Sequence, residues 1–186
     1  MTGSGGGHIR LVKPEPGHAG AWLAWRSDPV TLRFMAGQPQ GIDRLAARLG
    51  AVKSDLADRT GRLYRWMAVI KDVPIGTVSL SDPDWTHGHA EIGYLVAPEL
   101  RGRRVGSRMV SLAIEKAFAG GLFRLAAIIH HENLASQRLV ERLGFAREGL
   151  MRQHIICTGV RSDHVLYGLL KPEFRPARAD NAHGRP

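Results

Sequence analysis

The chain has 186 residues, 44% of them hydrophobic and 23% charged, which is ordinary for one folded domain with a sizeable core. The Gly/Ser-rich start does not resemble a signal peptide, and no apolar run approaches the ~18 residues of a membrane span. Because Cys157 is the only cysteine, an internal disulfide is excluded and a cytoplasmic location is expected. The formal net charge of +9 suits nucleic acid, an acidic protein surface or an anionic cofactor, and charge alone does not choose among them.

Patterns of apolar residues predict the elements of the first half of the chain. Residues 1–7 are expected to be flexible and residues 30–40 irregular. A compact turn over 71–74 predicts that the two strands beside it form an antiparallel hairpin. The predicted strands are 8–13, 64–70 and 75–80, and the predicted helices are 19–26 and 42–56.

The second half of the chain predicts one β-α-β unit followed by a short helix and two strands. The predicted elements are strand 90–96, loop 101–107, helix 108–118, strand 122–129, helix 133–143, strand 149–158 and strand 160–170. This order predicts an α/β fold with about four helices and a mixed, mostly antiparallel seven-stranded sheet. We expect a single domain over residues 8–171 and a disordered basic tail over residues 172–186.

The loop Arg101-Gly102-Arg103-Arg104-Val105-Gly106-Ser107 carries the strongest chemical signal. A strand, a basic glycine turn and a helix form a phosphate-binding arrangement, because backbone N–H groups converge there and the helix dipole favours an anion. Four arginines lie between positions 101 and 108, a density that suits several phosphates better than one carboxylate. The alternative is a solvated basic helix start.

Helix 133–143 carries a hydroxyl on its inward face. Asn133 stands at the N-cap position, and Ser136 shares one face with Leu139, Val140 and Leu143. The Ser136 hydroxyl is therefore either satisfied by backbone groups or exposed in a cleft.

These motifs together resemble a known family. The loop 101–107 resembles the acetyl-CoA pyrophosphate loop of GNAT-type N-acetyltransferases, with the signature Gln/Arg-x-x-Gly-x-Gly/Ala. Asn133-Leu134-Ala135-Ser136 and Leu143-Gly144-Phe145 resemble the second half of the same cofactor site. The likeness extends from about Ile9 to Leu170, and its last part resembles the RimJ/RimL branch of ribosomal-protein N-terminal acetyltransferases. One departure is Arg104, which stands where the family has its first glycine and would be strained at a positive φ.

The resemblance implies a GNAT fold whose central β-α-β unit holds acetyl-CoA as co-substrate. The implied cofactor-binding residues are Leu95, Val96, Arg101, Gly102, Arg103, Arg104, Val105, Gly106, Ser107 and Asn133. The backbone of Leu95 and Val96 would pair with pantetheine and polarise the thioester, and Asn133 would hold the pantetheine arm. The implied activity is direct acetyl transfer, in a ternary complex, to the primary amine of a peptide N-terminus or a small molecule. The alternative is a CoA-binding module without turnover.

Acetyl transfer needs a neutral amine, a polarised carbonyl and a hydrogen bond to the departing thiolate. Ser136 is the candidate thiolate donor, and Tyr167 is the fallback because many relatives use a tyrosine. Glu91 is the candidate base, alone or through a water, and the alternative is a carboxylate paired with an arginine.

His87 and His89 share a strand face with Glu91, which raises the question of a metal site. Strand neighbours on one face are roughly 7 Å apart, so no metal is expected there. His130 and His131 follow the next strand and either steer the substrate or serve the fold.

The acceptor pocket is expected to come from residues 22–40, the helix after Ile42 and the final hairpin. Trp25, Phe34 and Met35 line it or belong to the core. The basic surface argues against polyamines and for an acidic or neutral acceptor. A membrane partner is not expected, and nucleic acid ranks last because no basic stripe is interleaved with aromatic residues. Pairing of the final strands across a two-fold axis would give a homodimer.

Overall fold

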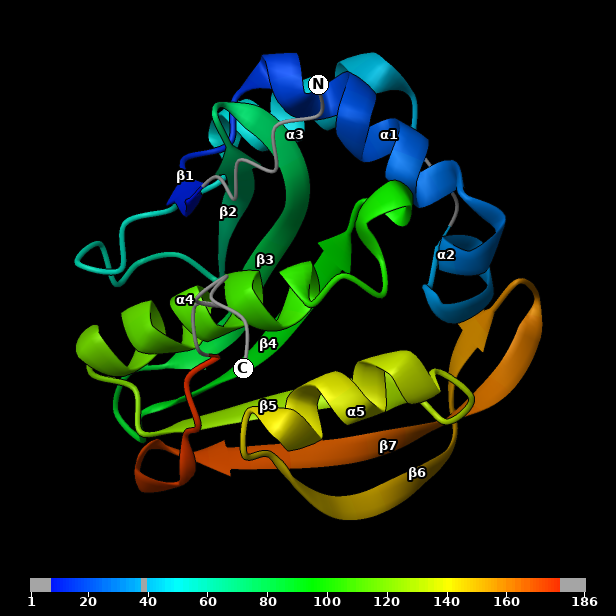
Figure 1. The fold of residues 1–186 in the computed structure, drawn as a ribbon. Helices are drawn as coiled ribbons and strands as arrows, with labels where there is room; N and C mark the ends of the chain where they lie inside the picture. The colour runs from blue at the N-terminus through cyan, green and yellow to red at the C-terminus, as the bar shows by residue number, and fades with distance from the viewer. Residues whose placement is uncertain (1–7, 38–39, 178–186) are drawn as a thin grey trace, which may run out of the picture.

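The computed structural model describes residues 8–37 and 40–177, and one seven-stranded sheet forms its centre (Figure 1). The strands follow the order β1-β2-β3-β4-β5-β7-β6, and only β4 and β5 pair in parallel. Their bounds are β1 (Ile9–Val12), β2 (Leu63–Ile70), β3 (Val73–Asp84), β4 (His89–Val96), β5 (Arg124–His130), β6 (Ala146–Cys157) and β7 (Val160–Leu170). The predicted mixed, mostly antiparallel sheet is confirmed.

Five α-helices lie within the described residues, where about four were predicted. They are α1 (Ala19–Ser27), α2 (Pro29–Phe34), α3 (Ile42–Ala51), α4 (Val105–Ala119) and α5 (Leu134–Arg142), with short 3-10 turns η1 (Pro16–His18), η2 (Pro98–Leu100) and η3 (Lys171–Glu173). The additional helix is α2, in a segment predicted to be irregular. It forms because Asp28 accepts the Thr31 N–H at 2.9 Å as an N-cap and Pro29 occupies the first turn.

Helix α3 ends at Ala51, before the predicted end at residue 56. The chain then runs beside β2, where the Lys53 carbonyl accepts the N–H of Arg65 at 2.8 Å. Leu56 still reaches the core from this loop, which explains why its helical spacing was misleading.

Two apolar cores lie on opposite faces of the sheet. Helices α4 and α5 cover one face, and α1 and α3 cover the other face of the N-terminal strands (Figure 1). Residues of β4 divide between them: Ile92 joins the core under α4, and Leu95 joins the core under α1 and α3. The helices thereby hold β4 firmly from both sides.

Strands β4 and β5 separate soon after they meet. Their pairing is limited to residues 89–91 against 124–126, and beyond this point the two strands diverge (Figure 1). Strand β5 continues along β7 instead. The sheet is therefore open between β4 and β5, next to the starts of α4 and α5.

The beginning of the predicted disordered tail is ordered. Residues 171–173 form η3, the rings of Phe174 and Phe118 meet edge to face at 6.0 Å, and the Arg175 N–H donates to the Leu143 carbonyl at 2.9 Å. The prediction of disorder was therefore wrong for residues 172–177, because apolar and backbone contacts hold them. Residues 1–7 and 178–186, predicted to be flexible and disordered, lie outside the described residues. Among the helices of the described residues, none has the length and apolar character to span a membrane.

Candidate active site

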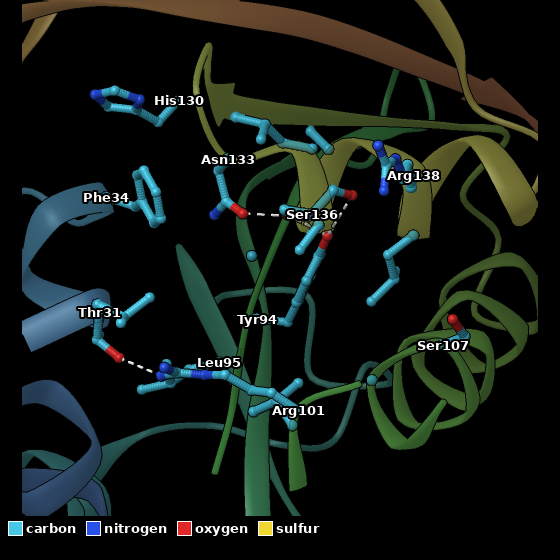
Figure 2. A pocket seen from close by; sticks show the side chains of 18 of the residues that line it. Thr31, Phe34, Tyr94, Leu95, Arg101, Ser107, His130, Asn133, Ser136 and Arg138 are labelled. Atoms are coloured by element: carbon cyan, nitrogen blue, oxygen red, sulfur yellow. Dashed lines mark hydrogen bonds between the residues drawn. The ribbon is translucent and has the colours of Figure 1, made fainter. Parts of the chain in front are cut away.

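A cavity of about 700 Å³ occupies the opening between β4 and β5 (Figure 2). Its walls come from α2, β4, β5, the loop before α4, the start of α4 and α5. Phe34 and Met35 line it, whereas Trp25 is only 5% exposed and belongs to the core. The cavity thus joins the predicted cofactor loop to the predicted acceptor region.

Most of the predicted cofactor-binding residues lie at this cavity. Those that line it are Leu95, Val96, Arg101, Gly102, Arg104, Gly106, Ser107 and Asn133, whereas Arg103 and Val105 do not. The Asn133 side chain caps α5 by accepting the Ser136 N–H at 3.1 Å, as its sequence position predicted. This bond uses one lone pair of its oxygen, and its NH₂ group remains available to a ligand.

Helix α4 begins inside the predicted loop, at Val105, and points its first N–H groups toward the cavity end of β4. These groups have no acceptor within the helix, so they are available to an anion. A side chain on Gly106 would lie 2.8 Å from Leu139 and 3.0 Å from Val96. The glycine therefore lets α4 start close against β4 and α5.

The polar lining is strongly basic. Arg101, Arg104, Arg138 and Arg142 line the cavity, and its described lining contains no aspartate or glutamate. Such a site fits a phosphorylated ligand. The sequence analysis missed Arg138 and Arg142, although their four-residue spacing within a predicted helix could have indicated a shared face.

Arg101 is directed to α2 rather than to the predicted phosphate site. Its guanidinium donates to Asp28 at 2.8 Å. It also donates to the Thr31 hydroxyl at 2.6 Å (Figure 2). Burial opposes ionisation of Asp28, but the hydrogen bonds from Arg101 and Thr31 outweigh it and lower the pKa of this carboxyl. At the other end of α2, Arg33 pairs with Glu132 at 2.8 Å. Helix α2 is therefore fixed as a wall of the cavity.

Arg104 adopts the left-handed conformation expected of the family glycine, with φ +58° and ψ +3°. This conformation costs a non-glycine residue roughly 1–2 kcal/mol. The departure from the family signature is thus a strained residue at the N-cap of α4, with its side chain beside the cavity.

The Arg104→Gly variant is expected to have a free energy of unfolding about 0.5–1 kcal/mol above that of the wild type. Glycine relieves the backbone strain at this position, and this gain exceeds the cost of the added entropy of the unfolded chain. Its affinity for acetyl-CoA should fall up to about tenfold, because one cation leaves the lining. Denaturant unfolding and calorimetric titration measure the two effects. The control is Gly102→Ala, which should lose stability, because Gly102 has φ +76° and an added Cβ would meet no atom within 4 Å, so only backbone strain acts. An Arg104→Gly protein less stable than the wild type would contradict the inference that Arg104 is strained.

The hydroxyl groups of Tyr94 and Ser136 form a pair at the centre of the cavity. Their oxygens are 2.6 Å apart, and the Tyr94 hydroxyl also lies 3.3 Å from the Ser136 carbonyl (Figure 2). Burial raises the pKa of Tyr94 well above its ordinary value of 10.0, although the Ser136 hydrogen bond opposes this, so the phenol keeps its proton at neutral pH. Ser136 faces a cleft, one of the two alternatives predicted for it. The sequence analysis considered only the face of β4 that carries Glu91. It therefore missed Tyr94, which strand alternation places on the opposite face.

The structure does not bring Tyr167 to the cavity. Tyr167 is fully buried, and its hydroxyl donates to carboxylate and amide oxygens on α5, at 2.9 Å to Glu141 and 3.2 Å to Gln137. Burial and then the Glu141 carboxylate raise its pKa to about 12. Its hydroxyl is thus committed to holding α5 on the sheet.

Glu91 does not line the cavity, but it shares a face of β4 with Gly93, which does. Partial burial and then the charge of Asp82 raise the pKa of Glu91, and His154 opposes them. His89 is exposed and faces Asp84 at 3.9 Å. Among the described residues no cluster of histidine, cysteine or carboxylate side chains could hold a metal ion.

His130 lines the cavity beside α2 and is only 6% exposed. Its ring lies 5.2 Å from that of Phe34, and its Nδ1 accepts the Glu132 N–H at 3.2 Å. Burial, followed by the charges of His131, His164 and Arg33, lowers its pKa against the opposing effect of Glu132. The neutral ring with its proton on Nε2 fits this bonding, so His130 presents a donor.

An open mixed sheet, a cavity where its parallel strands diverge and a basic helix start beside a part-buried hydroxyl pair fit an acyltransferase. The family described as Acetyltransferase (GNAT) domain matches residues 8–146, and the chain belongs to this family. Relatives include an uncharacterized N-acetyltransferase, YoaA, of Bacillus subtilis, 28% identical over 88% of this chain and 93% of its own. Another is the uncharacterized N-acetyltransferase p20 of Bacillus licheniformis, 30% identical over 89% and 94%.

Solved structures share the fold. Mycobacterium smegmatis RimJ in complex with CoA-disulfide has a TM-score of 0.80 and 19% identity, with coverage of 90% of this chain and 84% of its own. RimL, a ribosomal L7/L12 alpha-N-protein acetyltransferase in complex with coenzyme A, has a TM-score of 0.76 and 17% identity, with coverage of 87% and 93%. The predicted GNAT fold, the likeness to RimJ and RimL and the N-acetyltransferase class are confirmed.

Proposed function

We propose that the protein transfers the acetyl group of acetyl-CoA to the primary amine of a peptide N-terminus or a small molecule, by direct transfer in a ternary complex. The observation that carries the proposal is the Tyr94–Ser136 pair inside a cavity with a basic lining. Relatives named N-acetyltransferases support the reaction class. The solved structures that share the fold include enzymes named for a ribosomal protein and for spermidine, and thus for both kinds of amine.

The residues present fit acetyl-CoA. The first N–H groups of α4, together with Arg104, Arg138 and Arg142, would hold its phosphates, because this part of the lining carries cations and no described carboxylate. The edge of β4 at Leu95 and Val96 would hold the pantetheine arm, because on its β5 side β4 has no strand partner beyond residue 91 among the described residues, while β3 pairs with its other side. Acetyl-CoA supplies the activated acetyl thioester.

The Tyr94–Ser136 pair would donate a hydrogen bond to the departing thiolate. When Tyr94 donates to Ser136, at its hydroxyl or its carbonyl oxygen, the Ser136 proton is free to point into the cavity. Because the raised pKa keeps Tyr94 protonated, the pair remains a donor throughout the neutral range. The N–H of Val96 would polarise the carbonyl, because it faces the open side of β4, whereas the N–H of Leu95 faces β3.

Glu91 would accept the proton of the amine through a water, because it lies outside the lining yet on the same face as Gly93. His130 is less suited to this task, since the lone pair of Nδ1 already accepts a backbone N–H. Its Nε2–H would instead orient an acceptor carbonyl.

The Glu91→Gln variant is expected to lower kcat about tenfold to 100-fold at neutral pH, because general-base catalysis is lost. Glu91 acts when deprotonated, so the wild-type rate should rise with pH through a midpoint above 4.5, and the variant should lack this rise. Steady-state rates across pH measure the effect, with the acetyl-CoA affinity as control. Unchanged turnover would show that bulk water or another group, rather than Glu91, accepts the proton of the amine.

A thiol-release assay with acetyl-CoA and a panel of peptides and amines tests the proposed function. Thermal unfolding with and without acetyl-CoA tests binding separately, because a ligand of the folded state raises the midpoint by mass action. Binding without turnover on any acceptor would favour the CoA-binding module, for which strained Arg104 is the specific sign. The single domain, the cytoplasmic location and the homodimer stay predictions.

A further inference from the structure

Three arginines from different elements surround one buried tryptophan. The guanidinium carbons of Arg26 on α1, Arg48 on α3 and Arg65 on β2 lie 5.8, 5.8 and 4.5 Å from the ring centroid of Trp22. These distances are in the range of cation–π contacts. Trp22 is only 2% exposed, so the core fixes the ring and the ring gathers three positive charges in one place.

Carboxylates do not neutralise this cluster within the described residues. The Nε atoms of Arg26 and Arg65 are buried without a hydrogen-bond partner, and the described partner of Arg48 is the neutral Gln40 at 3.0 Å. Burial, followed by the charges of Arg48 and Arg26, lowers the pKa of Arg65 to about 10. Mutual repulsion raises the energy of the three cations, and an anion that binds beside them would lower it.

The cluster does not line the active-site cavity, but Arg65 lies two strands from the part of β4 that does, on the same face of the sheet as Glu91. Arg65 pairs with Ser79, and Ser79 pairs with Gly93, which lines the cavity. Two strand spacings, roughly 10 Å, therefore separate Arg65 from Gly93. In the next row, Leu95 is buried in the core under α1 and α3 that also contains Trp22. The arginines thus lie at the edge of the part of this sheet face that α1 and α3 cover.

We propose that Arg26, Arg48 and Arg65 bind a carboxylate of the acceptor, and that the acceptor is a peptide with an acidic side chain near its reacting N-terminus. The inference rests on the proposed function and specifies its substrate. An extended peptide advances about 3.3 Å per residue, so roughly 10 Å corresponds to about three residues. A polyamine carries only positive charge and is repelled by the same cluster.

The test uses three peptides that differ only at the third residue, which is Glu, Gln or Lys. The wild-type kcat/KM for the Glu peptide should exceed that for the Gln peptide about tenfold, and the Lys peptide should be poorest. Arg48→Gln and Arg65→Gln should each remove most of this preference and leave the Gln peptide nearly unaffected. Arg48 is exposed, so its replacement leaves the core intact. Arg10→Gln removes an equal charge on β1, where Arg10 pairs with Asp72, and should change nothing.

Calorimetric titration of the same peptides in the presence of CoA gives a readout that does not depend on turnover. Tighter binding of the Glu peptide, lost in Arg48→Gln and weakened by salt, supports the site even if no peptide is acetylated, in which case only the proposed function fails. Equal affinity for the Glu and Gln peptides would overturn the proposal. Faster acetylation of spermidine than of the Glu peptide would overturn it as well.

Discussion

Replacing Tyr94 by phenylalanine is expected to lower kcat about 100-fold and to leave the affinity for acetyl-CoA nearly unchanged. The variant removes the phenolic proton but keeps the ring, so the packing of β4 against α4 and α5 is retained. Ser136→Ala should reduce kcat by a similar factor, because each hydroxyl depends on the other across 2.6 Å. Steady-state kinetics with a saturating acceptor measure both effects.

The matched control is Tyr167→Phe. The hydroxyl of Tyr167 is bonded to Glu141 and Gln137, so its loss should cost about 1 kcal/mol of unfolding free energy and leave kcat within about twofold. The double variant Tyr94→Phe/Ser136→Ala should be little worse than either single variant, because the two groups act as a unit. A Tyr167→Phe enzyme that loses activity while Tyr94→Phe retains it would reverse the assignment.

The Gly144→Ala variant is expected to lose roughly 3 kcal/mol of unfolding free energy. Gly144 has φ +102°, which alanine adopts only with strain, and a Cβ at this position would overlap the carbonyl oxygen of Glu173. For a domain of this size the melting temperature should fall by roughly 10 °C. Thermal and denaturant unfolding measure the effect.

Gly149→Ala is the control for this prediction, since a Cβ at Gly149 meets no atom within 4 Å. Its stability should be unchanged or slightly raised. A Gly144→Ala protein as stable as this control would show that the turn after α5 can move away from η3.

The sheet was predictable because its strands alternate or form short apolar runs between clear turns. Helix α2 was missed because it is only 6 residues long, and its signal consists of a capping Asp28 and Pro29 rather than periodicity. The end of the chain was missed for a similar reason: single contacts, such as Phe174 against Phe118, hold it without any regular pattern.

The candidate site was predicted in its location more than in its chemistry. The loop and the Asn-x-x-Ser motif lie at the cavity, but Leu143-Gly144-Phe145 serves the turn into β6 and does not line it. Motif spacing identifies which segments meet, whereas hydroxyl partners depend on side-chain directions in the folded state. This is why the tyrosine beside Ser136 is Tyr94 and not Tyr167, the predicted fallback donor.

Arg101 belongs to the loop before α4 by its backbone and to α2 by its side chain. A ligand that fixes this loop therefore also fixes the helix on the acceptor side of the cavity. Thermodynamic reciprocity requires the acceptor to tighten donor binding by the same factor. One guanidinium group thus links two sites that need not touch each other, and the same coupling energy applies whichever substrate binds first.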